Sequence, residues 1–202
     1  MRNGKTDAIV CKYRAPVPAP ERLVDAIAVA ARSQGLPLAD VTVNLGLDGA
    51  ELYAYLALGE AAEVASAPLV AELARATGAS AVEVVRLARL QDLRGASHGA
   101  PPVFHYVVET DVVPEAERDL NDWYNVEHMP GLAAVPGTIR TQRFLNLDGA
   151  PRYHSCYELV SQETLGSAPW LAVRHTAWSD RVRPNFRNTK RTMFRRVAGR
   201  PL

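Results

Sequence analysis

Residues 45–50 read LGLDGA, and residues 145–150 read LNLDGA, an offset of 100 positions. Tyr53 and Tyr153 keep that offset, and the tripeptide Ser-Ala-Pro at 66–68 recurs at 167–169. Self-similarity at a fixed spacing is typical of a repeated structural unit. The repeat therefore predicts two tandem halves, residues 1–98 and 99–202, joined within a segment rich in Gly, Ser and Pro.

Around each copy of this motif the chain predicts the element order β-α-β-β-α-β. Apolar residues alternate or recur at helical spacing, and Asp48-Gly49 favours a two-residue hairpin turn in which both central residues need φ > 0. In the first half the predicted strands are 7–14, 40–47, 51–58 and 81–90, with helices 20–34 and 60–77. In the second half they are 103–110, 138–147, 152–160 and 186–197, with helices 114–128 and 161–182.

This order is that of the ferredoxin-like unit, an antiparallel sheet with both helices on one face. The other face of such a sheet is bare and apolar, and it must be buried. Two copies in one chain provide two such faces. We therefore predict an α+β fold in which two ferredoxin-like halves pack their antiparallel sheets together as an intrachain dimeric α+β barrel.

Composition fits an ordinary globular protein of 202 residues. The chain is 48% hydrophobic and 22% charged, which excludes a disordered or collagen-like protein. No apolar run reaches the roughly 18 residues of a membrane span, and the first ten residues lack a secretory apolar core. Two cysteines are too few for a disulfide framework. We expect a soluble, cytoplasmic protein that is a monomeric pseudo-dimer or a homodimer.

Charge is unevenly distributed although the net charge is only +1. Residues 174–200 hold eight arginines and one lysine against Asp180, whereas residues 109–127 hold seven acids and one base, Arg118. Two interpretations fit the basic segment: a last strand near the acidic helix of the same fold, or an electrostatic footprint for nucleic acid. Because the basic residues are not interleaved with aromatic ones, we favour the first and expect no nucleic-acid partner.

The predicted helix 114–128 directs two ionisable side chains toward its apolar side. At 100° per residue, Leu120, Trp123 and Tyr124 share one face. Glu127 falls in the middle of that face and His128 at its edge. A buried carboxylate must be paired or hydrogen-bonded, so Glu127 is either a structural tie, for example to an arginine of the last strand, or a functional acid/base. His128 is either a pocket residue or a cap of the helix end, where a cation is favoured.

The same helix carries a resemblance to a known family. Residues 123–130 read WYNVEHMP, and the chain continues with Val135-Pro136-Gly137, Arg152-Tyr153 and Tyr157-Glu158-Leu159. These spaced elements resemble the EthD-like branch of the dimeric α+β barrel superfamily, over roughly residues 103–197. The first half matches by element pattern and repeat alone, and we interpret it as a degenerate half that serves as scaffold.

The resemblance implies a small-molecule pocket between a sheet and its helices. By position, the family histidine is His128, its acidic neighbour is Glu127, and the aromatic pair is Trp123 and Tyr124. Members of the superfamily include cofactor-free monooxygenases, polyketide cyclases and dehydratases, lactone isomerases, haem enzymes, and proteins without a known activity. A haem enzyme is disfavoured because none of the five histidines stands out as a proximal ligand. The sequence departs from the family at His154-Ser155-Cys156, which stand in place of aliphatic residues and indicate either an adapted site or a different neighbour.

Further candidates follow from alternation along the strands. His105 and Tyr106 are adjacent on the predicted strand 103–110, so only one of them can face the pocket. Tyr153 and Tyr157 share one face of their strand. They are either core residues with satisfied hydroxyls or walls of the pocket.

Helical spacing adds two more candidates. Trp170, Arg174 and Trp178 are spaced i, i+4, i+8, which suits an arginine stacked between two rings or a clamp for a substrate carboxylate. The predicted substrate-binding residues are therefore Trp123, Tyr106, His105, Tyr153, Tyr157, Trp178 and Arg174.

These side chains suit general acid/base chemistry on a small molecule. Histidine is the natural proton carrier near pH 7; we predict His128, Glu127 and Tyr124 as catalytic residues, with Glu127 orienting the imidazole. The sequence has neither a glycine-rich phosphate loop nor metal-ligand spacing, so we expect no cofactor and no metal. The leading hypothesis is an isomerase, dehydratase or cyclase acting on an aromatic or polyketide-like substrate. The alternatives are a cofactor-free monooxygenase and a non-catalytic ligand-binding barrel.

Overall fold

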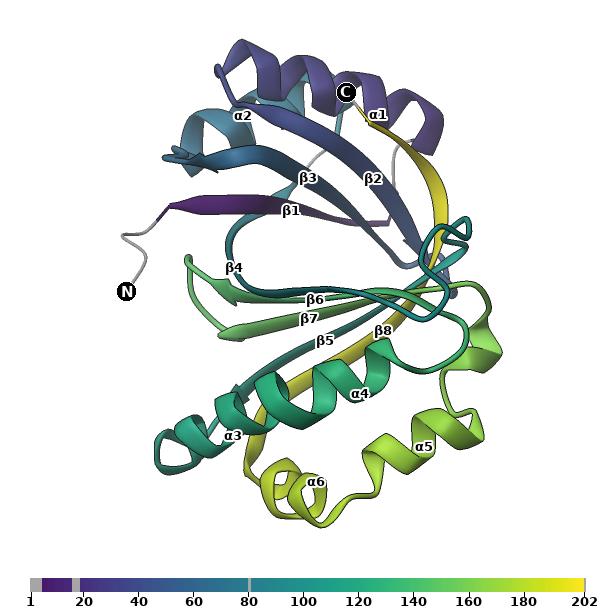
Figure 1. Cartoon of the computed structure of the whole chain (residues 1–202). Helices are drawn as coiled ribbons and strands as arrows, with labels where there is room; N and C mark the ends of the chain where they lie inside the picture. The colour runs from purple at the N-terminus through teal and green to yellow at the C-terminus, as the bar shows by residue number, and fades with distance from the viewer. Residues whose placement is uncertain (1–4, 16–18, 80, 202) are drawn as a thin grey trace. The chain divides into compact units, whose positions relative to one another are not determined.

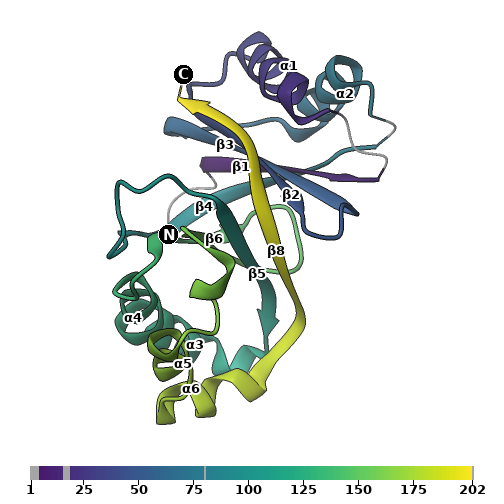
Figure 2. The same cartoon turned by 90° about the vertical axis from the view of Figure 1, so that its right-hand side faces the viewer.

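A computed structural model describes residues 5–15, 19–79 and 81–201 and divides into two compact units. Unit 1 holds the chain up to Arg89, Asn146–Asp148 and the segment from Phe194 onward. Unit 2 holds Leu90–Leu145 and Gly149–Met193. The last strand is continuous across this division (Figure 2), so one strand contributes residues to both units.

Both halves of the chain show the predicted element order. The first half contains β1 (Thr6–Arg14), α1 (Pro20–Ser33), β2 (Leu38–Gly46), β3 (Glu51–Ala62), α2 (Ser66–Thr77) and β4 (Glu83–Arg94). The second half contains β5 (Phe104–Val112), α3 (Glu117–Trp123), α4 (Met129–Ala133), β6 (Thr138–Asn146), β7 (Tyr153–Leu159), α5 (Ala168–Arg174), α6 (Ala177–Val182) and β8 (Phe186–Pro201).

Hydrogen bonding joins the strands in the order β1-β3-β2-β8-β5-β7-β6-β4, and β4 also pairs with β1. The result is an eight-stranded antiparallel barrel, so the predicted mixed α+β class is confirmed. A duplication as the origin of the two halves, and a domain boundary at residues 98 and 99, stay predictions.

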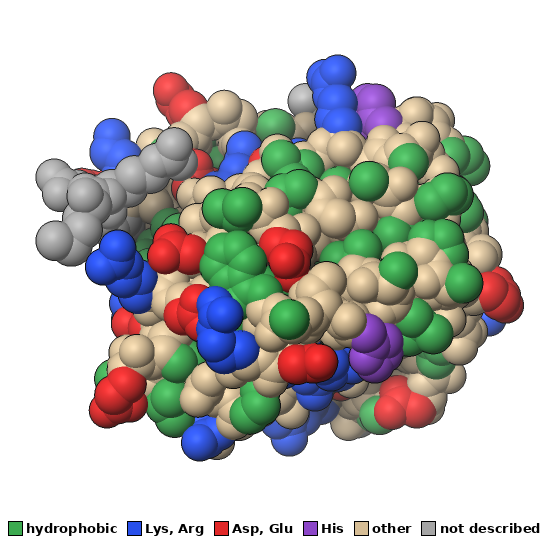
Figure 3. All heavy atoms as spheres, turned by 60° about the horizontal axis from the view of Figure 1, so that its bottom comes forward, with side chains coloured by type: hydrophobic (Ala, Val, Ile, Leu, Met, Phe, Trp, Pro, Cys, Tyr) green, Lys and Arg blue, Asp and Glu red, His purple; other side chains and the backbone are tan. Residues whose placement is uncertain are grey.

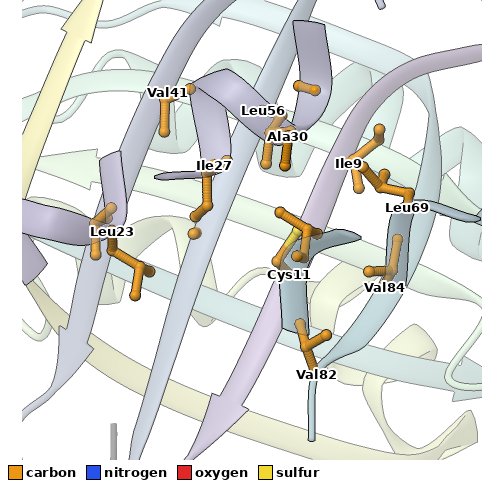
Figure 4. Packing of buried hydrophobic residues seen from close by; sticks show 14 of the residues in the cluster. Ile9, Cys11, Leu23, Ile27, Ala30, Val41, Leu56, Leu69, Val82 and Val84 are labelled. Atoms are coloured by element: carbon orange, nitrogen blue, oxygen red, sulfur yellow. The ribbon is translucent and has the colours of Figure 1, made fainter. Parts of the chain in front are cut away.

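In unit 1, α1 and α2 lie on one face of the sheet (Figure 1). Helix α1 begins at Pro20, which suits a first helical turn, and Gly35 follows it with φ +68°, a value that favours glycine. Each fully buried aliphatic side chain at such an interface contributes about 1.5–3 kcal/mol. The helix–sheet core shown in Figure 4 is mainly aliphatic and includes Leu23, Ile27, Ala30, Val41 and Leu56.

In unit 2, helices α3 to α6 lie on one side of the sheet (Figures 1 and 2). Strand β7 pairs with β5 and β6, and the register places Tyr106 opposite Tyr157 and Val108 opposite Ser155. These four side chains therefore share the face that the helices cover. The core here is aromatic as well as aliphatic, with Trp123, Tyr124, Tyr153, Tyr157 and Trp170 all buried.

The turn between β2 and β3 is longer than predicted. Residues 47–50 connect the two strands, and Gly49 has φ +70° whereas Asp48 does not have a positive φ. The Gly49 N–H donates to the Gly46 carbonyl at 2.8 Å, and the Ala50 N–H donates to Asp48 Oδ1 at 2.9 Å. The predicted two-residue turn is therefore wrong: the aspartate caps the loop through its side chain, and only the glycine needs the left-handed conformation.

The predicted helix 161–182 is broken into short pieces. Helix α5 ends at Arg174, His175 has non-helical φ −113° and ψ 41°, and the Thr176 hydroxyl accepts a hydrogen bond from the Ser179 N–H at 3.0 Å. Thr176 therefore acts as the N-cap of a new helix, α6. Arg174 and Trp178 consequently do not share a helical face, and the predicted i, i+4 pairing of the two is wrong.

Basic and acidic side chains are intermingled on the surface shown in Figure 3. From the basic segment, Arg181 donates two hydrogen bonds of 2.9 Å to Asp119 on α3, which confirms for this arginine that the basic segment meets the acidic helix. Within the described residues, no helix combines the length and apolarity needed to span a bilayer.

Candidate active site

A cavity lies on the helix-covered side of the sheet of unit 2. Its volume is about 40 Å³, enough for roughly two or three water molecules. An organic ligand therefore enters only if lining side chains move. The twelve lining residues are Tyr106, Val108, Trp123, Tyr124, His128, Leu132, Tyr157, Trp170, Arg174, Arg183, Phe186 and Arg191.

A π-helical turn directs His128 into this cavity. Residues 124–128 form one π turn between α3 and α4, in which the Met129 N–H donates to the carbonyl of Tyr124, five residues earlier. Pro130 has no N–H and would clash with the carbonyl four residues before it in a regular α-helix, and the wider turn accommodates it. The helix continues to Ala133 instead of ending at 128 as predicted. One extra residue in the turn brings His128, and not Glu127, to the cavity.

The His128 imidazole is held between two aromatic rings. It stacks on Trp123 with a centroid distance of 4.1 Å and an interplanar angle of 23°, and it meets Tyr124 edge-on at 5.2 Å. The side chain is 8% exposed, and its Nδ1 has no hydrogen-bond partner among the described residues. Burial, and then the positive charges of Arg183 and other arginines, lower the pKa of His128 to about 3. The ring is therefore neutral near pH 7.

Hydroxyl and indole donors surround the same cavity. Burial raises the pKa of Tyr106, Tyr124 and Tyr157 above the ordinary value, so all three remain protonated near pH 7 and can donate a hydrogen bond. Trp170 also lines the cavity, and its buried Nε1–H has no partner within the described residues. An oxyanion bound here would therefore meet neutral donors.

Arginines supply the charge of the site. Arg174 and Arg183 are half-buried, and Arg191 is exposed at the cavity mouth. Behind Tyr124, the guanidinium of Arg143 is 0% exposed and lies between the rings of Tyr124 and Tyr153, 4.2 Å and 4.5 Å from their centroids. Cation–π contacts of this kind favour a desolvated arginine, and they hold Tyr124 in place.

The Glu127 carboxylate joins two elements of unit 2 through hydrogen bonds. Its Oε1 accepts a hydrogen bond from Trp123 Nε1 at 3.1 Å and one from the Thr176 hydroxyl at 2.5 Å. Within the described residues these two hydrogen bonds go to the indole and the hydroxyl and none goes to His128, so this arrangement does not support the prediction that Glu127 orients the imidazole. The carboxylate instead fixes Trp123, the ring on which His128 stacks.

Three other predicted residues do not line the cavity. His105 is buried but alternates with Tyr106, which takes the cavity face. The Tyr153 hydroxyl donates to Glu117 at 2.6 Å and accepts from Asn121 at 2.9 Å. Trp178, displaced by the helix break, donates to Asp119 at 2.9 Å. His105 therefore lies on the other face of the sheet, and Tyr153 and Trp178 are held by hydrogen bonds outside the cavity.

Of the residues that depart from the family at 154–156, His154 and Cys156 lie on the opposite face of the sheet, whereas Ser155 lies on the face that the helices cover. His154 Nδ1 lies 3.5 Å from Glu109 Oε1, and both side chains are buried. The register pairs these two residues directly across β5 and β7. A polar pair explains why an aliphatic residue is absent at position 154, and it lies outside the cavity.

Arg183, Arg191 and Phe186 were not predicted as site residues. The signal for the two arginines was the basic segment 174–200, in which charge alone does not show which side chains face inward. Phe186 follows the short helical turn 183–185, whose position depends on the break after Arg174. All three residues reach the cavity only through tertiary packing of the C-terminal segment, which local sequence patterns do not specify.

A larger open groove of about 650 Å³ also lies on unit 2, lined by residues that include Asp92, Arg94, His98, Arg140 and Glu158. Arg140 donates to both oxygens of Asp92, at 2.8 Å and 2.6 Å. These two charges neutralise each other. The groove is therefore the larger candidate site, but the cavity holds the histidine, tyrosines and arginines that suit catalysis. Within the described residues, no group of three or more His, Cys, Asp or Glu side chains is placed to hold a metal ion.

No protein-family model and no curated protein matches this sequence. Among solved structures, the chain is similar to a protein of Lactobacillus acidophilus NCFM described as a candidate monooxygenase, with TM-score 0.63 and 10% identity over 97% of this chain and 96% of that chain. It is similar to an anthrone oxidase-like protein, with TM-score 0.56 and 14% identity over 99% and 94% of the two chains. It is also similar to chlorite dismutase of Candidatus Nitrospira defluvii, with TM-score 0.60 and 8% identity over 96% and 92%.

At such low identity these likenesses show the fold alone. They confirm the predicted α+β barrel fold, and membership of the ferredoxin-like superfamily stays a prediction. The EthD-like branch is not resolved by them and stays a prediction.

Proposed function

We propose that this chain is a small-molecule enzyme that removes a proton from an aromatic or polyketide-like substrate in the cavity of unit 2. The observation that carries the proposal is the buried, neutral His128, fixed between Trp123 and Tyr124, whose Nδ1 has no hydrogen-bond partner among the residues that the structure describes. An imidazole held rigidly in an aromatic-walled cavity is suited to general-base chemistry. The substrate ring would lie against the aromatic walls.

The low pKa of His128 fits this role when the substrate anion is included. In the empty cavity, burial and the nearby arginines disfavour a second positive charge. Proton transfer to His128 creates an imidazolium and a substrate anion together, so the new positive charge forms beside a new negative one. The arginines that oppose imidazolium formation in the empty site stabilise the anion formed on the substrate.

The tyrosines complete the proposed machinery. Tyr124, Tyr106 and Tyr157 keep their protons because burial raises the pKa of each, and we assign them as donors to the oxygen of a developing enolate. Glu127 acts as a positioning residue through Trp123. We propose that this chemistry proceeds without a cofactor, as the lack of phosphate-loop and metal-ligand motifs suggests.

The same enolate leads to isomerisation, dehydration or cyclisation, and we propose this reaction group as the function. A cofactor-free monooxygenase, in which the substrate anion itself reduces dioxygen, is the second candidate. Its support is the likeness to a candidate monooxygenase and an anthrone oxidase-like protein. We also propose that the second half belongs to the EthD-like branch and that the two halves arose by duplication, as the motifs and the repeat suggest.

The test measures proton removal directly, with anthrone as the probe. Under nitrogen in D₂O, the wild-type protein should accelerate hydrogen–deuterium exchange at the acidic methylene of anthrone above the buffer rate, as followed by NMR. His128→Asn should reduce the protein-dependent rate by about 10²-fold or more, with thermal stability at pH 7 largely retained. An unchanged rate in His128→Asn would show that His128 is not the base.

Repeating the reaction in air separates the two candidate functions. A monooxygenase consumes dioxygen as anthrone is converted to anthraquinone, with water as the second product. An isomerase, dehydratase or cyclase exchanges the proton and consumes no oxygen above the protein-free control. Binding of anthrone without exchange or oxygen consumption would favour the non-catalytic barrel.

A further inference from the structure

The lining of the cavity is electrostatically one-sided. Of its twelve residues, three are arginines and none is Asp or Glu. In the part of the chain that the structure describes, Arg174, Arg183 and Arg191 have no carboxylate partner within 4.0 Å. By contrast, Arg181 and Arg86 are each paired closely with an aspartate. The arginines at the cavity are therefore available to a ligand.

Keeping three like charges at one small cavity is unfavourable by itself. The pKa of Arg183 is lowered by burial and then by the positive charges of Arg174 and Arg191, and the negative charge of Asp180 offsets only part of this effect. Arg183 is therefore close enough to both arginines to be repelled by them. Among the described residues, the buried Nε1–H of Trp170, which lines the same cavity, also has no hydrogen-bond partner. An anion would relieve the repulsion and satisfy the donor together.

We infer that the cavity of unit 2 takes an anionic aromatic molecule, whose carboxylate lies among Arg174, Arg183 and Arg191 while its ring lies against Trp123 and Tyr157. Planar guanidinium groups bind carboxylates through paired, charge-assisted hydrogen bonds, and the aromatic walls favour a flat ring over an inorganic ion or a sugar. This inference rests on the proposed function, because it names the substrate class for the same cavity. It extends the candidate clamp from Arg174 to two arginines that the sequence pattern did not indicate.

Half-burial of the arginines also agrees with the small volume of the empty cavity. Arg174 is the last residue of α5, and Arg183 is the first residue of the turn before β8. Both line the cavity and expose part of the side chain to solvent. Long arginine side chains move at little cost compared with buried rings. Their rotation toward a bound carboxylate would open space for the ring.

The test compares two probes of nearly equal shape, 2-naphthoate and its neutral amide, 2-naphthamide. Binding is followed by quenching of tryptophan fluorescence at low ionic strength. Wild-type protein should bind 2-naphthoate at least 10-fold more tightly than 2-naphthamide. The double variant Arg183→Gln/Arg191→Gln should lose at least 10-fold in affinity for 2-naphthoate and less than 2-fold for 2-naphthamide.

The matched control is Arg118→Gln, which removes the same charge from a side chain 95% exposed on α3. It should leave both affinities within 2-fold of wild type, and circular dichroism should show that all variants are folded. Equal affinity for the two probes, or an unchanged preference in the double variant, would overturn the inference while leaving proton transfer by His128 intact. If neither probe binds, the inference is wrong, and the anthrone exchange experiment decides the proposed function separately.

Discussion

The two units share an element order and differ in what they bury. Among the described residues, unit 1 buries two polar or charged side chains, Thr6 and Asn44, whereas unit 2 buries eleven, including His128 and Arg143. Burying polar groups is costly unless they are paired. His128 lines the cavity, and its Nδ1 has no hydrogen-bond partner among the described residues. A ligand therefore explains its burial better than stability does, and unit 1 illustrates the same layout used for packing alone.

This difference assigns separate tasks to the two units. The apolar interior of unit 1 contributes free energy of folding, and the polar interior of unit 2 contributes a site. A substitution in unit 1 should therefore change stability with little effect on the site, whereas a substitution in unit 2 should change both. The experiments below test this contrast.

The largest effect is expected for Ile27→Ala in unit 1. Ile27 is fully buried in the apolar core of unit 1, and its truncation leaves a cavity that should lower the free energy of unfolding by about 3 kcal/mol. Urea unfolding at pH 7 measures the loss. Val29→Ala is the matched control on the same helix, since Val29 is 59% exposed, and it should change stability by less than about 0.5 kcal/mol. A large loss of ligand affinity in the folded Ile27→Ala protein would contradict the division of tasks.

An intermediate effect is expected for the pH dependence of stability in unit 2. The pKa of His128 falls from 6.5 to about 3 on folding, so the ring is neutral in both states above pH 6.5. As the pH falls from 6.5 toward 3, the unfolded chain binds a proton that the folded chain does not, and stability is lost. By pH 4.5 the loss from this group should be about 2.5 kcal/mol.

Urea unfolding of wild type and His128→Gln at pH 7 and pH 4.5 measures this term. Other titrating groups contribute equally to both proteins, so the wild type should lose more stability than the variant over this interval. An identical loss in the two proteins would mean that the imidazole is hydrated in the folded state, and the contrast between the two interiors would be weaker.

The smallest effect is expected at Glu127. Glu127→Ala removes the acceptor of Trp123 Nε1 and of the Thr176 hydroxyl and should cost about 1–2 kcal/mol of stability. Glu127→Gln keeps an acceptor oxygen and should recover most of this loss. Its anthrone exchange rate should fall less than 10-fold, because Glu127 acts through Trp123. A loss as large as that of His128→Asn would make Glu127 a direct acid/base.

Element order and approximate bounds followed from the sequence because each depends on local patterns. The apolar stripe of α1 and the aspartate-glycine loops mark their positions with neighbours close along the chain. The predictions failed at two local irregularities in the helices. The π turn before Pro130 turns His128 toward the cavity. Thr176 caps a new helix, which separates Trp178 from Arg174. Neither irregularity changes the fold, but each changes which side chains meet.

The site was therefore predictable in part. Six of the ten predicted residues line the cavity, because strand alternation and the aromatic pair on the helix are local features. Arg183 and Arg191 join them through the folding of the C-terminal segment onto the sheet, and charge in a sequence does not specify direction. Arg143 on β6 is buried against two tyrosines for the same tertiary reason.

Strands β4 and β8 each contribute residues to both units, which affects how the chain can be divided into fragments. The C-terminal part of β8 pairs with β2 inside unit 1, from Phe194 opposite Gly46 to Pro201 opposite Asp40, whereas residues 90–94 at the end of β4 belong to unit 2. Cutting the backbone between positions 98 and 99 would give two fragments, each with an edge strand whose backbone hydrogen bonds are unpaired. Expressed alone, either piece should aggregate; produced together, they should behave as a complementing split protein.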